Sequence, residues 1–531
     1  MDYQALRFEH RRCAEQDAAA PLRTPVVIVG AGPVGMTLAL DLAQQGIKVV
    51  LLDDDNKLSV GSRAICFAKR TLEIFDRLGV GDAMVAKGVS WNVGKVFCKG
   101  DHVYTFNLLA EEGHQRPAFI NLQQYYVEGY LCDAVLQQPN IDVRWKHKVL
   151  AVDNRTDGVA LTVESPDGSY ALAADYVIAC DGSRSPVRQA LGLESKGQTF
   201  RDRFLIADVK MTAPFPTERW FWFDPPFHPN QSVLLHKQPD NVWRIDFQLG
   251  WDADPEEEKK PERVRPRVQA LLGADTEFEF EWISVYTFAC MRMEKFRHGR
   301  VLFAGDSAHL VSPFGARGAN SGIQDVDNLA WKLALVLRDD APDRLLDTYA
   351  SEREFAADEN ILNSTRATDF ITPKSEVSRL FRDAVLALAK DQPFARRIVN
   401  SGRLSVSATL HDSQLNTPRT DEFFGAMVPG APAVDAPVLI DGLKEWFLSF
   451  LITEFVCVTL DESKALCFSP STPEREVRSQ QIIASAEWIA RYDARPGTTY
   501  LFRPDQHVCA RWRQYDETAV RAAIARATCN D

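Results

Sequence analysis

The sequence contains no uninterrupted apolar run of the ~20 residues that a membrane-spanning helix needs. It also lacks an excess of positive charge, because 61 Lys and Arg residues stand against 73 Asp and Glu residues, for a net charge of −12. An acidic chain is repelled by nucleic acid, and its charge favours solubility. We therefore expect neither a membrane span nor a nucleic-acid partner.

Cysteine occurs in no pattern that indicates disulfides or a metal site. The ten cysteines are scattered over 531 residues, and none forms a Cys-x-x-Cys pair. With 45% hydrophobic residues, the chain can build its core without cross-links, so we expect reduced, mostly buried thiols. No cluster has metal-ligand spacing. Residues 1–24 lack the apolar region of a secretory signal, so we expect an N-terminal extension on a cytoplasmic protein.

The segment 26–53 is typical of a strand, a glycine turn, a helix and a second strand. Gly30, Gly32 and Gly35 permit, in turn, a tight bend, close approach of a pyrophosphate, and packing of the helix on the strand. Asp53 ends the second strand, 23 positions after the first glycine, close to the ~20 expected for a ribose-binding acid. The pattern predicts a dinucleotide site but does not distinguish FAD from NAD(P).

Two later segments also place acids at strand ends. Asp181-Gly182 follows an apolar strand, and Gly305-Asp306 follows another. In an open α/β sheet, ligands bind at the carboxyl ends of the strands, so both acids are expected at the same crevice. A long helix begins near 318–320, where backbone amides could bind an anion or an oxyanion.

Residues 201–289 read as aromatic, alternating strands of a mixed or antiparallel sheet that could wall a pocket for a planar substrate. His236 and Arg244 lie on this sheet, and Tyr286 lies on the strand leading to the Gly305-Asp306 segment. A histidine or tyrosine could relay a proton, and an arginine could hold a carboxylate. All three could equally be satisfied side chains in or beside the core.

Three motifs in order carry a family resemblance: GAGPVG at 30–35, ACDGSRSPVR at 179–188 and FAGDSAHLVSPFGARGANSGIQD at 303–325. Together they resemble the single-component FAD-dependent aromatic hydroxylases (class A flavoprotein monooxygenases), most nearly the hydroxylases of hydroxyphenylpropionate and similar phenols. The resemblance covers about residues 24–400, whereas residues 416–531 resemble the redox-inactive thioredoxin-like domain of larger members.

The resemblance implies an α/β fold (α+β overall) with interleaved domains. A Rossmann-like FAD-binding domain would comprise 25–200 and 290–400, with the substrate-binding sheet domain at 201–289 inserted between them. A Pro/Gly-rich linker at 416–432 would lead into the C-terminal thioredoxin-like domain.

The resemblance also implies roles for residues in this chain. Gly30, Gly32 and Gly35 would hold the FAD pyrophosphate, and Asp53 the adenosine ribose. Members often have Glu-Arg at the end of the second strand, whereas this chain has Asp53-Asp54, so the adenine-side arginine is absent. The other implied contacts are Arg63 and Gln124 at the flavin and ribityl chain, Asp181 and Gly182 for FAD and NAD(P)H, Asp306 for the ribityl hydroxyls, and Pro313, Gly318, Ala319 and Asn320 beside the isoalloxazine ring.

The implied activity is ring hydroxylation of a small phenol in aromatic catabolism. NADH or NADPH would reduce FAD, which with O2 would form a C4a-hydroperoxide whose distal oxygen the phenolate ring takes up. His236, Arg244, Tyr286 and Pro313 are the catalytic candidates, and a homodimer is left open. One alternative is a related flavin monooxygenase doing epoxidation, Baeyer–Villiger insertion or oxidative decarboxylation. The other is an NAD-dependent dehydrogenase or a non-catalytic nucleotide-binding protein, against which the Gly305-Asp306 segment argues.

Overall fold

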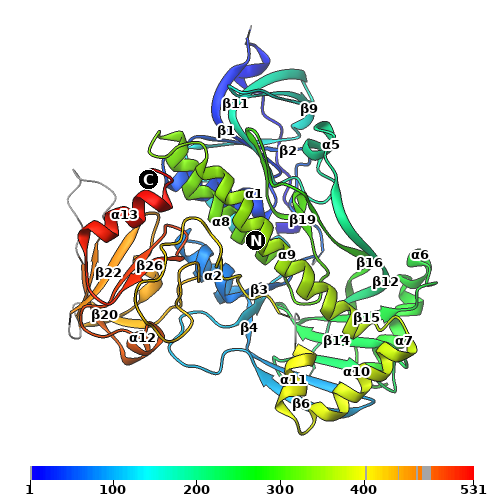
Figure 1. Cartoon of the computed structure of the whole chain (residues 1–531). Coiled ribbons are helices and arrows are strands. Elements are labelled where there is room, and N and C mark those ends of the chain that lie inside the picture. Colours follow the sequence, from blue (N-terminus) through cyan, green and yellow to red (C-terminus); the bar gives the residue numbers. More distant parts are fainter. Residues whose placement is uncertain are drawn as a thin grey trace.

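The computed structural model describes residues 3–18, 20–61, 63–213, 215–400, 404–440, 442–461, 464–468 and 480–531. Within these residues, three large β-sheets are connected and covered by helices (Figure 1). The first sheet carries the glycine turn, the second is rich in aromatic side chains, and the third lies in the C-terminal part of the chain. In the described part of the chain no helix is long and apolar enough to cross a membrane.

The first sheet is built on the predicted strand-turn-helix-strand segment. β1 (Leu22–Val29) pairs in parallel with β2 (Val49–Asp53) on one side and with β11 (Gly168–Ala179) on the other. β8 (Ile141–Trp145) and β18 (Val301–Phe303) continue the parallel order outward. The carboxyl ends of β1, β2, β11 and β18 therefore share one edge, where the glycine turn and both Asp-containing segments lie.

The second sheet is mixed and has the order β19-β16-β12-β15-β14-β13-β5-β6. Only the β5–β13 pair is parallel. β5 and β6 come from before residue 108, so this sheet draws on more of the chain than 201–289. Its strands are β5 (Val93–Cys98), β6 (Asp101–Asn107), β12 (Ser195–Lys210), β13 (Arg219–Phe223), β14 (Ser232–Lys237), β15 (Val242–Leu249), β16 (Glu279–Met293) and β19 (His309–Leu310).

Helices border these sheets, and further strands either complete the first sheet or form a small three-stranded sheet. α1 (Pro33–Gln44) follows the glycine turn and packs on α8 (Gly318–Leu337). The remaining elements up to residue 400 are β3 (Cys66–Ala68), α2 (Lys69–Arg77), α3 (Gly81–Lys87), β4 (Val89–Trp91), β7 (Phe119–Asn121), α4 (Gln124–Leu136), β9 (Lys148–Asn154), β10 (Val159–Ser165), α5 (Pro186–Ala190), α6 (Pro255–Glu258), α7 (Pro261–Leu272), β17 (Arg297–His298), α9 (Leu345–Ile371), α10 (Glu376–Ala389) and α11 (Pro393–Asn400).

The described residues of the N-terminal extension pack on the first sheet and its helices. Tyr3 is buried, and its hydroxyl donates to Asp133 Oδ2 at 2.6 Å. Phe8 stacks on Trp145, with ring centroids 4.4 Å apart. These contacts tie residues 3–8 to α4 and β8.

The C-terminal sheet has only antiparallel pairs among its described strands. The sequence pattern near 479–491 by itself predicts one helix, but β24 (Gln480–Ala484) precedes a shorter α12 (Ala486–Arg491). The prediction was wrong there because β24 pairs with both β20 and β23, and Ser485 caps the helix only after it. The other elements are β20 (Pro437–Ile440), β21 (Leu443–Trp446), β22 (Val456–Asp461), β23 (Lys464–Phe468), β25 (Thr499–Phe502), β26 (Val508–Trp512) and α13 (Glu517–Ala527).

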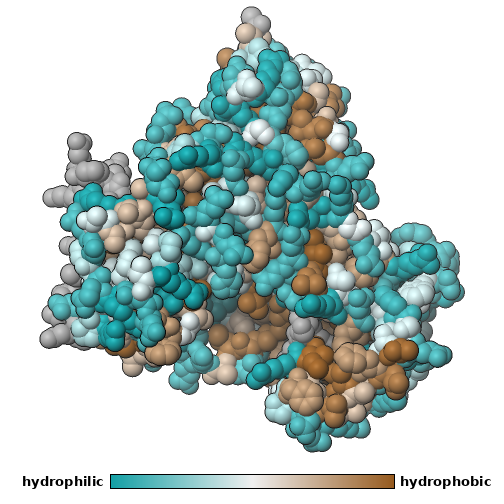
Figure 2. Space-filling view, in the orientation of Figure 1, coloured by the Kyte–Doolittle hydropathy of each residue, from teal (hydrophilic) through white to brown (hydrophobic). Residues whose placement is uncertain are grey.

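One surface is conspicuously apolar. Figure 2 shows a brown patch at the lower right, where Figure 1 places α10 and α11. Large apolar side chains on these helices are 38% to 78% exposed, which is more than a lone surface residue requires. They are Val377, Leu380, Phe381, Leu388, Phe394 and Ile398.

Candidate active site

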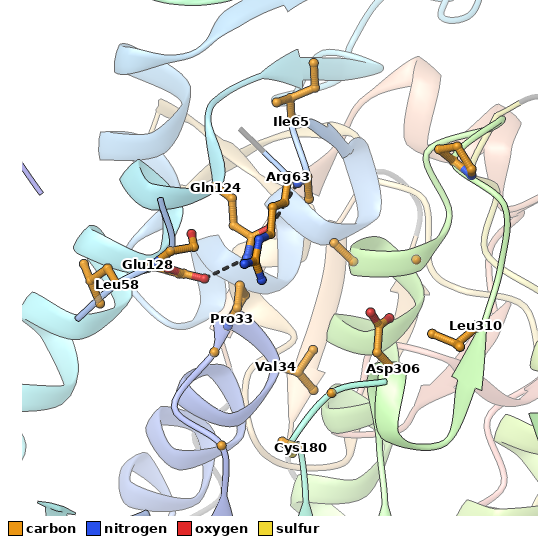
Figure 3. Close-up of a pocket in the computed structure, with 18 of the residues that line it drawn as sticks. Pro33, Val34, Leu58, Arg63, Ile65, Gln124, Glu128, Cys180, Asp306 and Leu310 are labelled. Atoms are coloured by element: carbon orange, nitrogen blue, oxygen red, sulfur yellow. Dashed lines mark hydrogen bonds between the residues drawn. The ribbon is translucent and has the colours of Figure 1, made fainter. Parts of the chain in front are cut away.

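A single cavity of about 1060 Å³ joins the carboxyl edge of the first sheet to the inner face of the second (Figure 3). Except for Gly35, every site residue expected from the sequence lines it. The volume reaches the upper end of the range for sites that enclose a cofactor or a drug-sized ligand.

The glycine turn forms the floor at the β1 end. Gly30 has φ +105°, and a Cβ there would lie 2.4 Å from the carbonyl oxygen of Cys180. A Cβ on Gly35 would lie 1.9 Å from the carbonyl oxygen of Gly30, so this glycine lets α1 pack against the turn without reaching the cavity. A Cβ on Gly32 would meet nothing within 4 Å, which leaves room for a ligand to approach the backbone. The start of α1 has no side-chain cap, so its amides can bind a pyrophosphate.

Asp53 lies beside this turn at the end of β2. Its Oδ2 accepts from the Ala31 amide at 2.7 Å, and its Oδ1 accepts from the Asp55 amide at 2.9 Å. Burial raises the pKa of Asp53 to about 6 despite these bonds. Lys57 and Lys148 line the same cavity, so they are candidate cations in place of the missing adenine-side arginine.

The loop carrying Arg63 is held by two side chains of α4. Gln124 accepts from the Ala64 amide at 3.0 Å and donates to Glu128 at 2.7 Å. Glu128 also accepts from the Ser59 amide at 2.6 Å, and Figure 3 shows Arg63 extending from the loop toward these two residues. Glu128 was not predicted, although its i,i+4 spacing from Gln124 places both on one helix face.

Two acids face the cavity from the ends of β11 and β18. Asp181 Oδ2 accepts from the Val187 amide at 3.1 Å, whereas its Oδ1 is buried without a hydrogen-bond partner in the described structure. Burial raises the pKa of Asp181 to about 6. The Asp306 carboxylate points into the cavity (Figure 3). Desolvation by the surrounding protein raises its pKa. Unpaired acceptors and an open glycine backbone fit a hydroxyl-rich dinucleotide such as FAD.

Replacing Asp181 by asparagine is expected to stabilise the cofactor-free protein while weakening FAD binding. Between pH 4 and pH 6 the native carboxyl keeps a proton that the unfolded chain has lost, so its contribution to stability falls as pH rises through this window. Asp181→Asn has no carboxyl to titrate, so it should avoid this fall and raise the free energy of unfolding at pH 7 by about 1–3 kcal/mol. Urea unfolding at several pH values and FAD titration measure the two effects, with Asp157→Asn in an exposed turn as the control. An unchanged pH slope would refute the assignment.

The start of α8 closes the cavity from the opposite side. Pro313, Gly318 and Ala319 line it, and this helix start also lacks a side-chain cap. Asn320 lines it too, but its amide is fully used: it accepts from the Ala68 amide and Thr71 and donates to two backbone carbonyls. Asn320 therefore fixes α8 against β3 and α2, and a direct amide contact to a cofactor stays a prediction.

A buried ionic cluster holds the Gly305-Asp306 turn in place through a hydrogen bond to the Gly305 amide. Asp325 accepts from the Gly305 amide at 2.9 Å, from His309 at 2.7 Å and from Arg353 at 2.7 Å. Although burial opposes it, the charges of His309 and Arg353 lower the pKa of Asp325 to about 2. His309 is thus a structural residue here. Asp325 lies within the third motif but was not singled out from the sequence.

At the other end of the cavity, cross-strand neighbours on the second sheet bring the catalytic candidates together. His236 on β14 lies opposite Arg244 on β15, which lies opposite Asp208 on β12. Arg244 donates to both oxygens of Asp208 at 2.9 and 3.0 Å. Tyr286 lines the cavity from β16, and its pKa is raised well above the usual value, chiefly by burial and also by Asp246.

His236 is held neutral. Its side chain is 2% exposed, and burial, with the charges of Arg219 and Arg244, lowers its pKa well below 6.5. Nδ1 lies 3.8 Å from the Cys66 sulfur, and Nε2 is buried with no hydrogen-bond partner in the described residues. His236 thus presents an unused nitrogen in a wall of the cavity.

A family described as FAD binding domain matches residues 23–364, more than half of the chain. The chain belongs to this family. The flavoprotein is 29% identical over 401 residues to a 3-(3-hydroxy-phenyl)propionate/3-hydroxycinnamic acid hydroxylase from Mycolicibacterium smegmatis, covering 74% of this chain and 69% of that one. It is 33% identical over 395 residues to a probable NADH-specific resorcinol 4-hydroxylase from Rhodococcus jostii, covering 73% and 72%.

Solved structures agree with the fold. The flavoprotein matches the flavin-dependent monooxygenase PieE, in complex with FAD and substrate, with a TM-score of 0.80 at 20% identity over 96% of this chain and all of that one. For p-nitrophenol 4-monooxygenase PnpA from Pseudomonas putida, the TM-score is 0.64 at 27% identity, over 72% and 97%. The cofactor prediction of FAD is confirmed, and the chain is an FAD-dependent monooxygenase of the aromatic hydroxylase class.

Proposed function

We propose that this flavoprotein hydroxylates the ring of a small phenol with NAD(P)H and O2. The observation that carries the proposal is the continuous cavity, which links the glycine turn to an aromatic pocket where His236 Nε2 has no hydrogen-bond partner among the described residues. FAD, when bound, supplies the oxygen transfer that the protein itself cannot perform. The balanced reaction consumes the phenol, one NAD(P)H, one O2 and one proton, and gives the hydroxylated ring, NAD(P)+ and one water.

In this proposal His236 Nε2 accepts the phenol proton. The Cys66 thiol donates to Asn121 Oδ1 at 3.2 Å, so its sulfur is left to accept from His236 Nδ1, which favours the tautomer with a free Nε2 lone pair. Removing the phenol proton makes the ring electron-rich, as transfer of an electrophilic oxygen requires. Phe288 and Phe314 pack edge to face and line the cavity, which helps to keep water from the reacting atoms.

Replacing His236 by glutamine is expected to lower kcat for phenol hydroxylation 10²- to 10⁴-fold, the usual contribution of a general base. Because the pKa of His236 lies well below 6.5, titration of His236 should cause no change in the wild-type kcat near pH 6.5. Steady-state kinetics against pH measures both effects. His228→Gln is the control, since His228 bonds the Gln248 carbonyl on the same sheet and does not line the cavity. A loss as large in the control would contradict the role.

The test of the function is a panel of phenols added to the FAD-loaded protein with NADH or NADPH. We expect at least one phenol to accelerate NAD(P)H oxidation and to yield a product with one further hydroxyl. Oxidation that yields only H2O2 with every phenol would favour the alternative of epoxidation, Baeyer–Villiger insertion or oxidative decarboxylation. A protein that stays colourless after reconstitution with FAD would refute both.

Several finer assignments remain part of the proposal. The exposed apolar side chains of α10 and α11 support a homodimer, because a second copy of the chain would cover them. The C-terminal region is proposed to be thioredoxin-like and structural. A cytoplasmic location and the absence of a nucleic-acid partner stay predictions.

A further inference from the structure

The pocket wall holds an acid that the mechanism does not use. Asp246 on β15 lies opposite Ile206 on β12 and Leu234 on β14, one row of side chains from His236 and Arg244. Residues two apart on a strand share a face, so Asp246 and Arg244 both project from the face that lines the cavity. Asp246 was not predicted as a site residue.

Asp246 is buried, and one of its two carboxylate oxygens has no hydrogen-bond donor in the described part of the chain. Its side chain lines the cavity, the residue is 8% exposed, and Oδ1 has no partner among the described residues. Buried carboxylates are nearly always hydrogen-bonded, so an orphan in a cavity wall points to a ligand that donates to it. Burial raises the pKa of Asp246 to about 6, which leaves it mainly ionised at neutral pH.

Two arginines lie near Asp246, and only one of them is available to a ligand. Arg244 forms a bidentate ion pair with Asp208, so the two residues together add no net charge to the pocket. Arg219, at the start of β13, donates to the Cys66 sulfur at 3.6 Å, and no carboxylate of the described chain lies within ion-pair distance of it. Both Arg219 and Asp246 line the cavity, and their opposite charges roughly cancel.

This balance of charge discriminates between substrates. A carboxylate tail could approach Arg219, but it would bring a second negative charge close to Asp246 in a pocket where charges are poorly screened. A neutral hydroxyl can donate to Asp246 Oδ1 and accept from Arg219, which satisfies both groups. A site with an unpaired buried polar group rejects ligands that cannot satisfy it.

We propose that Asp246 and Arg219 select an uncharged phenol that carries a second hydroxyl group, and disfavour phenols with a carboxylate side chain. This inference rests on the proposed function. Asp246 is a specificity-determining residue in it, because its carboxylate touches the second hydroxyl and takes no part in deprotonating the first.

The test compares resorcinol, phenol and 3-(3-hydroxyphenyl)propionate on the FAD-loaded wild type and on Asp246→Asn. Dissociation constants come from the change in flavin absorbance on titration, and kcat/KM from product formation with NADH. Asp252→Asn, at an exposed position after β15, is the matched control. Asp246→Asn keeps the shape of the side chain and removes its charge.

For the wild type we expect resorcinol to be favoured at least tenfold over phenol and over the arylpropionate. Asp246→Asn should weaken resorcinol at least tenfold and improve the arylpropionate, while Asp252→Asn changes neither. A wild type that prefers the arylpropionate tenfold, or a ratio unchanged in Asp246→Asn, overturns this inference and leaves the hydroxylase function intact. If no phenol is hydroxylated, the function fails, and the dissociation constants still decide the selectivity.

Discussion

Replacing Gly35 by alanine is expected to yield a protein that is purified without FAD. The added methyl carbon would lie 1.9 Å from the carbonyl oxygen of Gly30, a distance that no packing can accept, so α1 must move away from β1. That shift displaces the amides at the start of α1 from the pyrophosphate. We expect the FAD dissociation constant to rise at least 100-fold, measured by flavin fluorescence, with a lowered melting temperature of the apoprotein.

Gly32→Ala is the matched variant. Its Cβ would meet nothing within 4 Å, and its φ of −77° is open to any residue, so the apoprotein should melt like the wild type. FAD affinity should nevertheless fall at least tenfold, because the methyl group occupies space that the pyrophosphate needs. If Gly32→Ala bound FAD as tightly as the wild type, the claim that the pyrophosphate lies against Gly32 would be contradicted.

Replacing Glu352 by alanine is expected to destabilise the protein by about 3–5 kcal/mol, the usual cost of breaking a buried ion pair. Glu352 on α9 accepts from Arg503 at 2.6 Å and from Lys332 on α8 at 2.7 Å. These three side chains are at most 1% exposed, and Arg503 follows β25, so the cluster fastens the C-terminal sheet to α8 and α9 (Figure 1).

The loss should depend on pH in a defined direction. Burial lowers the pKa of Lys332 to about 8 although Glu352 opposes the shift, so the lysine is charged below that pH and neutral above it. The destabilisation of Glu352→Ala should therefore be largest below pH 8 and shrink above it. Guanidinium unfolding measures it. Glu517→Ala, which breaks the exposed Glu517–Arg521 pair on α13, should cost only about 0.3–0.5 kcal/mol. Equal losses in the two variants would contradict the cluster's role.

The cofactor half of the site was predictable because its residues lie in short, local patterns. The glycine spacing and Asp53 define a strand-turn-helix-strand unit, and Asp181 and Asp306 each follow a recognisable apolar strand. These patterns can be recognised in the sequence because the geometry of a tight strand-to-helix turn requires glycine at fixed positions.

The substrate half was only partly predictable, because it is created by strand pairing between distant segments. His236 and Arg244 were noted as chemistry-bearing residues, but their alignment with Asp208 follows from the register of three strands. Asp246 and Arg219 look like ordinary charged residues of amphipathic strands until that register places them in one cavity wall. Nor could the sequence show that β5 joins β13, since they are more than 100 residues apart.

The central claim is that FAD bound in this cavity transfers oxygen to a phenol. The most direct measurement is the mass of the aromatic product formed by the FAD-loaded protein with NAD(P)H under ¹⁸O₂. The account predicts a hydroxylated product carrying one ¹⁸O atom, with no label when only the water is enriched. A product whose new oxygen comes from water, or oxygen consumption that ends entirely as H2O2 with every phenol, would contradict it.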